Sequence, residues 1–389
     1  MSRKAASGVG TIRKKTVTRK GKEYTYWEAR YSAGRDPGTG RQIQRSITGK
    51  TQKEVAQKLK AATVAIDTGT YTAPNKMTVA EWLDAWSNDY LGGVKPTTAS
   101  VYKNNISKHI KPALGAINLS ALRPHMVQGF INGIDLSPAS VLLAYKVLHQ
   151  ALEKAVKLEY IAKNPADGCE LPRREQAEIH PLDDKQTAAL IRAASGSEFE
   201  SLINAALFTG LRQSELLGLT WDCIDFKRGT LLVNKQLSRS SYRKNESLFT
   251  SPKNGKARTI TPAPSVLKIF RAHKRHQAEM QIAAGPLWEN PHNLVFTGRF
   301  GGPLEQWTVK NGFRVLADSA GLSTARFHDL RHTYAVNAIR AGDDIKTIQG
   351  NLGHSSAAFT LDRYGHFTER MKADSAARME GFMKDVLGL

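Results

Sequence analysis

Two polar, proline-containing breaks divide this chain into three parts. The first runs from Thr70 to Pro74, and the second begins at Asn164-Pro165 and continues through residues 169–182. Proline lacks a backbone donor and disfavours helix at the residue before it, so each break ends the element that precedes it. At 389 residues, the chain has the length for about two or three domains. We expect domains at residues 1–72, 76–170 and 180–389.

The first part is basic and rich in strand-forming residues. Residues 1–60 hold 16 Lys or Arg against 4 Asp or Glu, so +12 of the net charge of +21 lies there. Strand candidates cover residues 10–14, 24–32 and 42–48, with turn signals at residues 19–22 and 36–40. A helix begins at Thr51, where Glu54 completes a capping box. We expect a three-stranded sheet backed by one helix, preceded by ten disordered residues.

This charge surplus favours a polyanionic partner, usually nucleic acid, over a purely solubilising role because it is uneven along the chain. Tyr24, Tyr26 and Trp27 could contact DNA from the sheet. Strand alternation predicts that about half of these aromatic residues pack under the helix instead.

Residues 76–170 predict an all-helical bundle. Thr78 and Glu81 form a second capping box, and Trp82 and Trp86 lie on the apolar stripe that follows. Further helices are predicted at residues 97–110, 124–131 and 138–158. The two tryptophans are typical of a core rather than of base stacking.

Other features restrict the class of protein. Cys169 and Cys223 are the two cysteines; they form no disulfide framework and no CxxC pair, which fits a reducing compartment and no structural zinc. No apolar run approaches the roughly 18 residues of a membrane span. The start of the chain lacks the apolar segment of a signal peptide. We expect a cytoplasmic protein, associated with the nucleoid when bound to DNA.

The third part carries a group of residues that suits an anionic substrate. His328 and Arg331 are three residues apart in a run with helical spacing, so they share one face. His354 follows 23 residues after Arg331, and Tyr364 follows ten residues later. The planar guanidinium of arginine matches two phosphate oxygens.

A second arginine lies far upstream. Arg212 follows Gly210, which can end a helix, and Glu215 lies one turn further on, where it could hold the guanidinium. Taken together, Arg212, His328, Arg331, His354 and Tyr364 resemble the tyrosine recombinase (phage integrase) family in order and spacing, over roughly residues 200–370. The three-part organisation resembles the integrases of phages and conjugative transposons.

The resemblance implies a fold and a reaction. The fold is an α+β multidomain protein: a sheet-plus-helix module that binds arm DNA, a helical bundle that binds core DNA, and a mainly helical catalytic domain with a small antiparallel sheet. The reaction is site-specific recombination through a 3′-phosphotyrosyl intermediate, which integrates and excises a mobile genetic element. The diester exchange needs no cofactor and no metal ion, since the arginines take the place of a metal.

The resemblance also assigns roles. Tyr364 is the expected nucleophile, Arg212 and Arg331 bracket the phosphate, His354 donates a hydrogen bond, and His328 accepts the tyrosine proton. Glu215 orients Arg212.

A lysine on a β-hairpin protonates the leaving 5′-oxygen in this family. Residues 229–237 predict a strand, and Asn254-Gly255 predicts a tight turn between strands at residues 248–253 and 256–262. This turn would put Lys253 and Lys256 on one sheet face. The resemblance favours Lys253.

Several alternatives stay open. Tyr334 is a rival nucleophile, although its stripe favours the core, and Tyr242 lies in a polar loop. His332 and His366 either support the site or merely pack. A type IB topoisomerase shares the chemistry, and a non-catalytic DNA-binding regulator would need none of the site residues.

The expected partners are double-stranded DNA at core and arm sites, further copies of the chain in a homotetramer, and accessory DNA-bending or excision factors. A final helix near residues 369–386 carries an apolar stripe. It packs on its own domain or, as the resemblance favours, on a neighbouring protomer.

Overall fold

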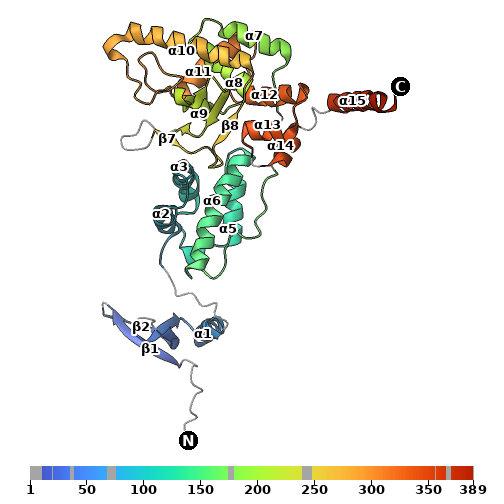
Figure 1. The fold of residues 1–389 in the computed structure, drawn as a ribbon. Helices are drawn as coiled ribbons and strands as arrows, with labels where there is room; N and C mark the ends of the chain where they lie inside the picture. Colours follow the sequence, from blue (N-terminus) through green and yellow to red (C-terminus); the bar gives the residue numbers. More distant parts are fainter. Residues whose placement is uncertain are drawn as a thin grey trace. The chain divides into compact units, whose positions relative to one another are not determined.

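The structure is a computed structural model that describes residues 11–19, 21–35, 39–67, 76–173, 179–238, 248–354, 356–364 and 369–388. The first ten residues, most of the turn at residues 36–40, the break at residues 70–74, Tyr242 and His366 lie outside these ranges. The chain separates into two compact units, residues 1–175 and 176–389, which are described separately (Figure 1).

The first unit begins with an antiparallel sheet in the order β1 (Ile12–Arg19), β2 (Lys22–Arg35), β3 (Gln42–Gly49). Helix α1 (Gln52–Asp67) packs on this sheet through Val55 and Leu59, against Ala29 and Tyr31. Trp27 joins the edge of this small core, whereas Tyr24 stays 54% exposed. The predicted division of the aromatic residues between core and surface is thus confirmed, and so is the sheet-plus-helix fold.

The same unit continues as a helical bundle. Its helices are α2 (Val79–Asp89), α3 (Pro96–Asn105), α4 (Lys111–Leu114), α5 (Pro124–Gly133) and α6 (Pro138–Lys157). Trp82 and Trp86 are buried, and the Trp82 indole donates to the carbonyl of Ala151. The predicted all-helical core is confirmed.

One predicted helix of the bundle is interrupted. The expected helix at residues 97–110 becomes α3 and a π-helical turn η1 (Ile106–Ile110), and α4 follows directly after it. Pro112 follows this turn and has no backbone N–H to give to a carbonyl one turn back, which explains the local rearrangement.

The second unit is mainly helical. It contains α7 (Asp184–Ala194), α8 (Glu200–Thr209), α9 (Gln213–Leu217), α10 (Pro264–Ala284), α11 (Gln306–Ser319), α12 (Asp329–Arg340), α13 (Ile345–Leu352), α14 (Ala357–Tyr364) and α15 (Glu369–Leu387). Short 3-10 turns η2 (Leu119–Ala121), η3 (Trp221–Cys223) and η4 (Gly285–Leu287) occur in the chain as well.

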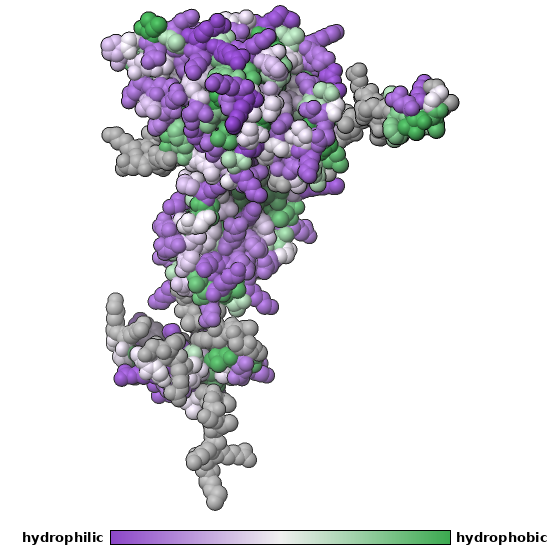
Figure 2. All heavy atoms as spheres, viewed as in Figure 1, coloured by the Kyte–Doolittle hydropathy of each residue, from purple (hydrophilic) through white to green (hydrophobic). Residues whose placement is uncertain are grey.

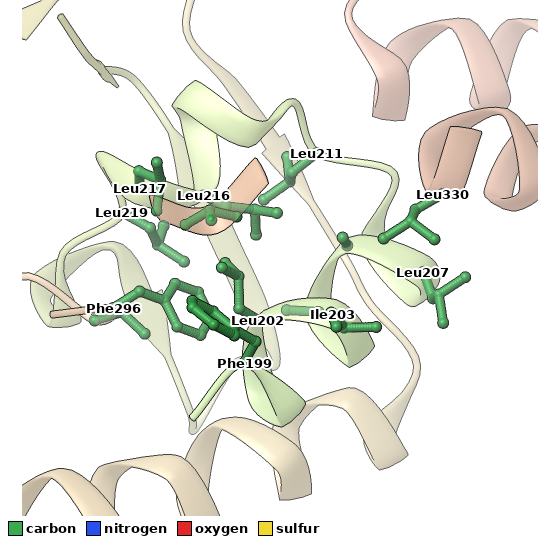
Figure 3. Packing of buried hydrophobic residues seen from close by; sticks show 14 of the residues in the cluster. Phe199, Leu202, Ile203, Leu207, Leu211, Leu216, Leu217, Leu219, Phe296 and Leu330 are labelled. Carbon is green, nitrogen blue, oxygen red and sulfur yellow. The ribbon is translucent and has the colours of Figure 1, made fainter. Parts of the chain in front are cut away.

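The core of this unit forms around α8. Phe199, Leu202 and Ile203 pack against Leu216 and Phe296, as Figure 3 shows. Leu330 of α12 belongs to the same core, so the helix that follows His328 is fixed against the helix that precedes Arg212.

The expected hairpin around Asn254-Gly255 is wrong. β7 (Phe249–Thr250) pairs with β6 (Gln236–Leu237), whereas β8 (Arg258–Ile260) pairs with β5 (Thr230–Val233), which also pairs with β4 (Ile224–Asp225). The strands on the two sides of the turn therefore belong to different small sheets. The predicted single strand at residues 229–237 divides into β5 and β6, which explains why the chain builds two sheets.

The last helix, α15, exposes its apolar stripe. Met379, Phe382, Met383, Val386 and Leu387 are all at least 44% exposed, and Figure 2 shows hydrophobic atoms gathered along one side of this helix. Over the described ranges, no helix has the length and apolar character that crossing a membrane requires.

Candidate active site

Arg331 is held by the ends of two helices. Its Nη1 donates to the carbonyl of Gly210, 2.7 Å away, and its Nη2 donates to the carbonyl of Leu352, 2.6 Å away. Gly210 ends α8 with a φ of +63°, and a Cβ on it would lie 2.3 Å from Tyr334. Glycine is therefore required there, both for the left-handed backbone and for space.

Burial and the nearby charge of Arg212 lower the pKa of Arg331 to about 9. The side chain is 3% exposed, yet it remains a cation at neutral pH. A buried cation of this kind favours an anion beside it.

Arg212 belongs to a second buried group of charges. Its Nη1 donates to Glu215 Oε1 at 2.8 Å, and its Nη2 donates to the carbonyl of Gly353 at 3.1 Å. Arg258 of β8 forms a two-pronged ion pair with the same carboxylate, at 3.0 and 2.7 Å, and donates through Nε to the carbonyl of Asn351. Glu215 thus holds two arginines, and the prediction that it could hold Arg212 agrees with this geometry.

Burial alone would raise the pKa of Glu215. The hydrogen bonds and charge of Arg258, aided by Arg212, outweigh it and lower the pKa to about 2. The carboxylate is therefore ionised at neutral pH, and it keeps both guanidinium groups in fixed orientations.

His328 and His354 lie close to these arginines. The pKa of His328 is lowered to about 4, by removal of its inner side from water and by the charge of Arg331. The same two causes lower the pKa of His354 to about 3. Both rings are neutral at pH 7, so each offers one N–H donor and one acceptor.

Tyr364 is the last residue of α14 and is 1% exposed. Its ring is stacked on that of His354, with centroids 6.3 Å apart and an interplanar angle of 12°. Its hydroxyl lies 2.7 Å from Nδ1 of His332 on α12. The ring of His332 in turn meets the ring of His328 edge to face, at 4.9 Å between centroids.

Lys253 lies in the turn that the hairpin prediction placed between two paired strands. The N–H of Gly255, with a φ of +70°, closes the turn on the carbonyl of Pro252. Lys253 and Lys256 are both exposed, but neither belongs to a strand, so the expectation of a shared sheet face is wrong. Asn254 donates to the carbonyl of Gly353 at 2.9 Å and ties the turn to the residue before His354.

The structure thus brings together Arg212, Glu215, His328, Arg331, His354 and Tyr364, and it links the Lys253 turn to them through Asn254. Tyr334 points elsewhere: its ring packs against Gly210, and its hydroxyl accepts from Asn351. Within the described ranges, no group of three or more His, Cys, Asp or Glu side chains is arranged to hold a metal ion.

Sequence reasoning missed Arg258 and left His332 open. Arg258 lies 43 residues from Glu215 in the chain, and only the pairing of β5 with β8 brings them together. His332 carried a usable signal, since it lies one helical turn after His328. Its contact with Tyr364 depends on how α12 and α14 pack.

Two family models match this chain. The phage integrase family matches residues 181–371, and the SAM-like N-terminal domain of phage integrases matches residues 78–134. The first match spans the whole candidate site up to and beyond Tyr364.

Relatives match over most of their length. A tyrosine recombinase XerC-like protein of Caldanaerobacter subterraneus is 26% identical over 93% of this chain and 97% of its own. An integrase of Streptomyces ambofaciens is 28% identical over 92% of this chain and 94% of its own.

Solved structures share the fold. The Tn1549 transposon integrase in complex with a circular intermediate DNA gives a TM-score of 0.65 at 22% identity, over 78% of this chain and 99% of that one. A lambda integrase tetramer bound to a Holliday junction gives a TM-score of 0.59 at 21% identity, over 86% of this chain and 92% of that one.

Proposed function

The chain belongs to the phage integrase family of tyrosine recombinases, and from this premise we propose how its own residues cut and rejoin DNA. It is a site-specific recombinase of the integrase type, which acts in the integration and excision of a mobile genetic element. One observation carries the assignment of the site. Arg212, Arg331, His354 and Tyr364 come from four separate segments and meet in one cluster, in which Arg331 and Tyr364 are buried and the other two are partly buried.

The two arginines bind the scissile phosphate. A guanidinium has five N–H donors, and the bonds to backbone and to Glu215 occupy two on each arginine. The remaining donors are available for the non-bridging oxygens, whose negative charge grows in the transition state. His328 and His354, both neutral, add hydrogen bonds there. Because backbone carbonyls and Glu215 orient the arginines beforehand, little reorganisation is needed when DNA binds.

Tyr364 attacks phosphorus, and the 5′-oxygen of the next nucleotide leaves. Lys253 gives that oxygen its proton, because the turn that carries it is joined to the site through Asn254 and Gly353. Lys256 lies just beyond the same turn and is the alternative donor. The product is a 3′-phosphotyrosine, which a 5′-hydroxyl from another strand later attacks.

The other parts of the chain extend the DNA contact. We assign core-site binding to residues 76–170 and arm-site binding to residues 1–72, where Arg13, Lys15 and Arg30 surround the buried Glu28 on the sheet. The exposed stripe of α15 suits contact with a second protomer, in a homotetramer that works with accessory DNA-bending factors.

Replacing Tyr364 by phenylalanine tests the assignment directly. The change removes one oxygen, and with it the atom that attacks phosphorus. Tyr364→Phe should bind DNA as the wild type does and form no covalent adduct. The measurement is a denaturing gel of protein mixed with DNA that carries the joined ends of the element. Thermal unfolding checks that the variant is folded.

Tyr334→Phe is the matched control, because Tyr334 is also a hydrogen-bonded tyrosine of this unit. It should keep the adduct. An adduct that persists in Tyr364→Phe, or one that disappears in folded Tyr334→Phe, would show that Tyr364 is not the nucleophile. Absence of the adduct in the wild type would favour the DNA-binding regulator.

A further inference from the structure

The tyrosine hydroxyl faces a histidine that the family resemblance did not assign. His332 is 7% exposed on α12, and its Nδ1 lies 2.7 Å from Oη of Tyr364, which is 1% exposed. Both groups are therefore shielded from bulk water, so the tyrosine proton needs an acceptor within the protein. The distance is within the range in which a base takes a proton directly.

His328, the expected proton acceptor, occupies a different position. It immediately precedes α12 and is exposed. Its ring packs edge to face with the His332 ring, and it is His332 that lies beside the tyrosine hydroxyl. An exposed imidazole at the rim is well placed to meet a phosphate that arrives from solvent. The group that touches the tyrosine oxygen lies one helical turn deeper.

We propose that His332 is the residue that accepts the Tyr364 proton during cleavage and returns it during rejoining. This proposal rests on the assignment of Tyr364 as nucleophile. In cleavage, the bond from Oη to phosphorus forms and the bond from phosphorus to the 5′-oxygen breaks. The tyrosine proton moves to Nδ1 of neutral His332, and the departing oxygen receives a proton from Lys253. In rejoining, the 5′-hydroxyl gives its proton to the now neutral Lys253 and attacks phosphorus, the bond from phosphorus to Oη breaks, and the imidazolium returns its proton to Oη.

The surrounding charges make this transfer depend on DNA. Positive groups disfavour a new cation beside them. A bound phosphate supplies the negative charge that offsets a new imidazolium. The titratable groups that the contacts place at His332 are His328, just before α12, Tyr364 on α14 and His354 after α13; Arg331 is its neighbour on α12, and Arg212 and Arg258 act on the adjacent His354 ring.

The other imidazoles do not obscure the measurement. His328 and His354 have pKa values lowered to about 4 and about 3, so both are already neutral above pH 5.5. The rates of cleavage are therefore compared above pH 5.5, where titration of these two rings does not contribute.

The experiment measures single-turnover formation of the covalent adduct against pH in the full-length protein. The substrate is a duplex of the element's joined ends in which sulfur replaces the bridging 5′-oxygen. Thiolate leaves without a proton, so the lysine no longer affects the rate and the base alone limits it. For the wild type, we expect the covalent adduct to form in a single turnover at pH 7.

His332→Asn is the decisive variant. Its side-chain amide reaches the position of Nδ1 and keeps a hydrogen bond to Oη, but it cannot take up a proton. At pH 7 it should be about 10²-fold slower or more, and its rate should rise with pH, because hydroxide must then take the proton in place of the side chain. His332→Ala should be equally slow and should recover when free imidazole is added.

Controls separate this proposal from the assignment of the nucleophile. His276→Asn changes an exposed histidine of α10 and should match the wild type. If His332→Asn keeps the wild-type rate and pH profile, the histidine only positions the tyrosine and the proposal is wrong. An adduct in Tyr364→Phe would instead refute the assignment of Tyr364.

Discussion

Glu215 joins two arginines of the site through its carboxylate, and neutralising it should destabilise that part of the fold. Its side chain is completely buried, and its oxygens accept hydrogen bonds from Arg212 and Arg258 at 2.7–3.0 Å. Glu215→Gln keeps the shape and removes the charge. Two guanidinium groups then remain close together without a counter-ion.

The magnitude follows from the pKa. That of Glu215 falls from 4.5 to about 2, and each pKa unit corresponds to about 1.36 kcal/mol. Loss of the ionised carboxylate should therefore cost about 3 kcal/mol at pH 7. Removing one partner of a buried ion pair costs roughly 3–5 kcal/mol in general, which agrees. No discount for solvent screening applies, because the side chain has no exposed surface.

The sign of the pH dependence is fixed by the direction of the shift. A carboxylate with a lowered pKa stabilises the fold fully above about pH 4.5, and this contribution is lost as the pH falls towards 2. The difference between wild type and Glu215→Gln should therefore be largest at neutral pH and shrink below pH 4.5. Titration of His328 and His354 in the same range affects both proteins and cancels in the comparison.

Hydrogen exchange followed by mass spectrometry measures this locally. Peptides from α8 and α9 should lose about 10²-fold of their protection at pH 7, which is the exchange equivalent of about 3 kcal/mol. Peptides from α2 and α6 provide an internal control, since they belong to the other unit. Glu279→Gln, a change of an exposed carboxylate, should have little effect. Protection of α8 and α9 within about threefold of wild type would refute the reasoning, since that is under about 1 kcal/mol.

Two further predictions concern the lysine and the first domain. Lys253→Ala should cleave normal DNA about 10²–10⁴-fold more slowly than wild type but should cleave the 5′-thio substrate almost as fast. Lys256→Ala should be nearly normal on both substrates. If the 5′-thio substrate restores cleavage only in Lys256→Ala, Lys256 is the proton donor instead of Lys253. Deleting residues 1–72 should leave cleavage of a core site intact and abolish binding to arm sites. The isolated module of residues 1–72 should bind DNA with an affinity that falls steeply with added salt, because Lys and Arg contacts release counterions. A module that binds no DNA at low salt would contradict this prediction.

Local patterns in the sequence predicted most of the elements. Capping residues located the starts of α1 and α2 closely, because the free energy of a helix end depends on its own neighbours in the chain. The interruption between α3 and α4 was not predicted, although Pro112 indicates one. The strands around Asn254-Gly255 were paired wrongly because a turn signal does not tell which partner strand is available.

The site divides in the same way. Arg212, Arg331, His354 and Tyr364 could be named from order and spacing, because the chemistry requires those residue types. The bonds that hold them could not. Gly210, Leu352 and Gly353 contribute through their backbone carbonyls. Every residue type has the same carbonyl, so the amino-acid sequence does not show which ones bind the arginines. Arg258 and His332 depend on strand pairing and on the packing of α12 against α14, which no local pattern encodes.

The Gly353 carbonyl has a consequence for how such a site tolerates change. Arg212 and Asn254 both donate to it, and a backbone carbonyl does not depend on the side chains of the helix before it. Exposed side chains along α13 can therefore be exchanged without altering what the two donors meet, whereas Ile348 and Leu352 are buried. Inserting or deleting one residue in α13 would instead rotate its last turn by about 100° and carry the acceptor away. This part of the site should thus accept many substitutions and no change of length.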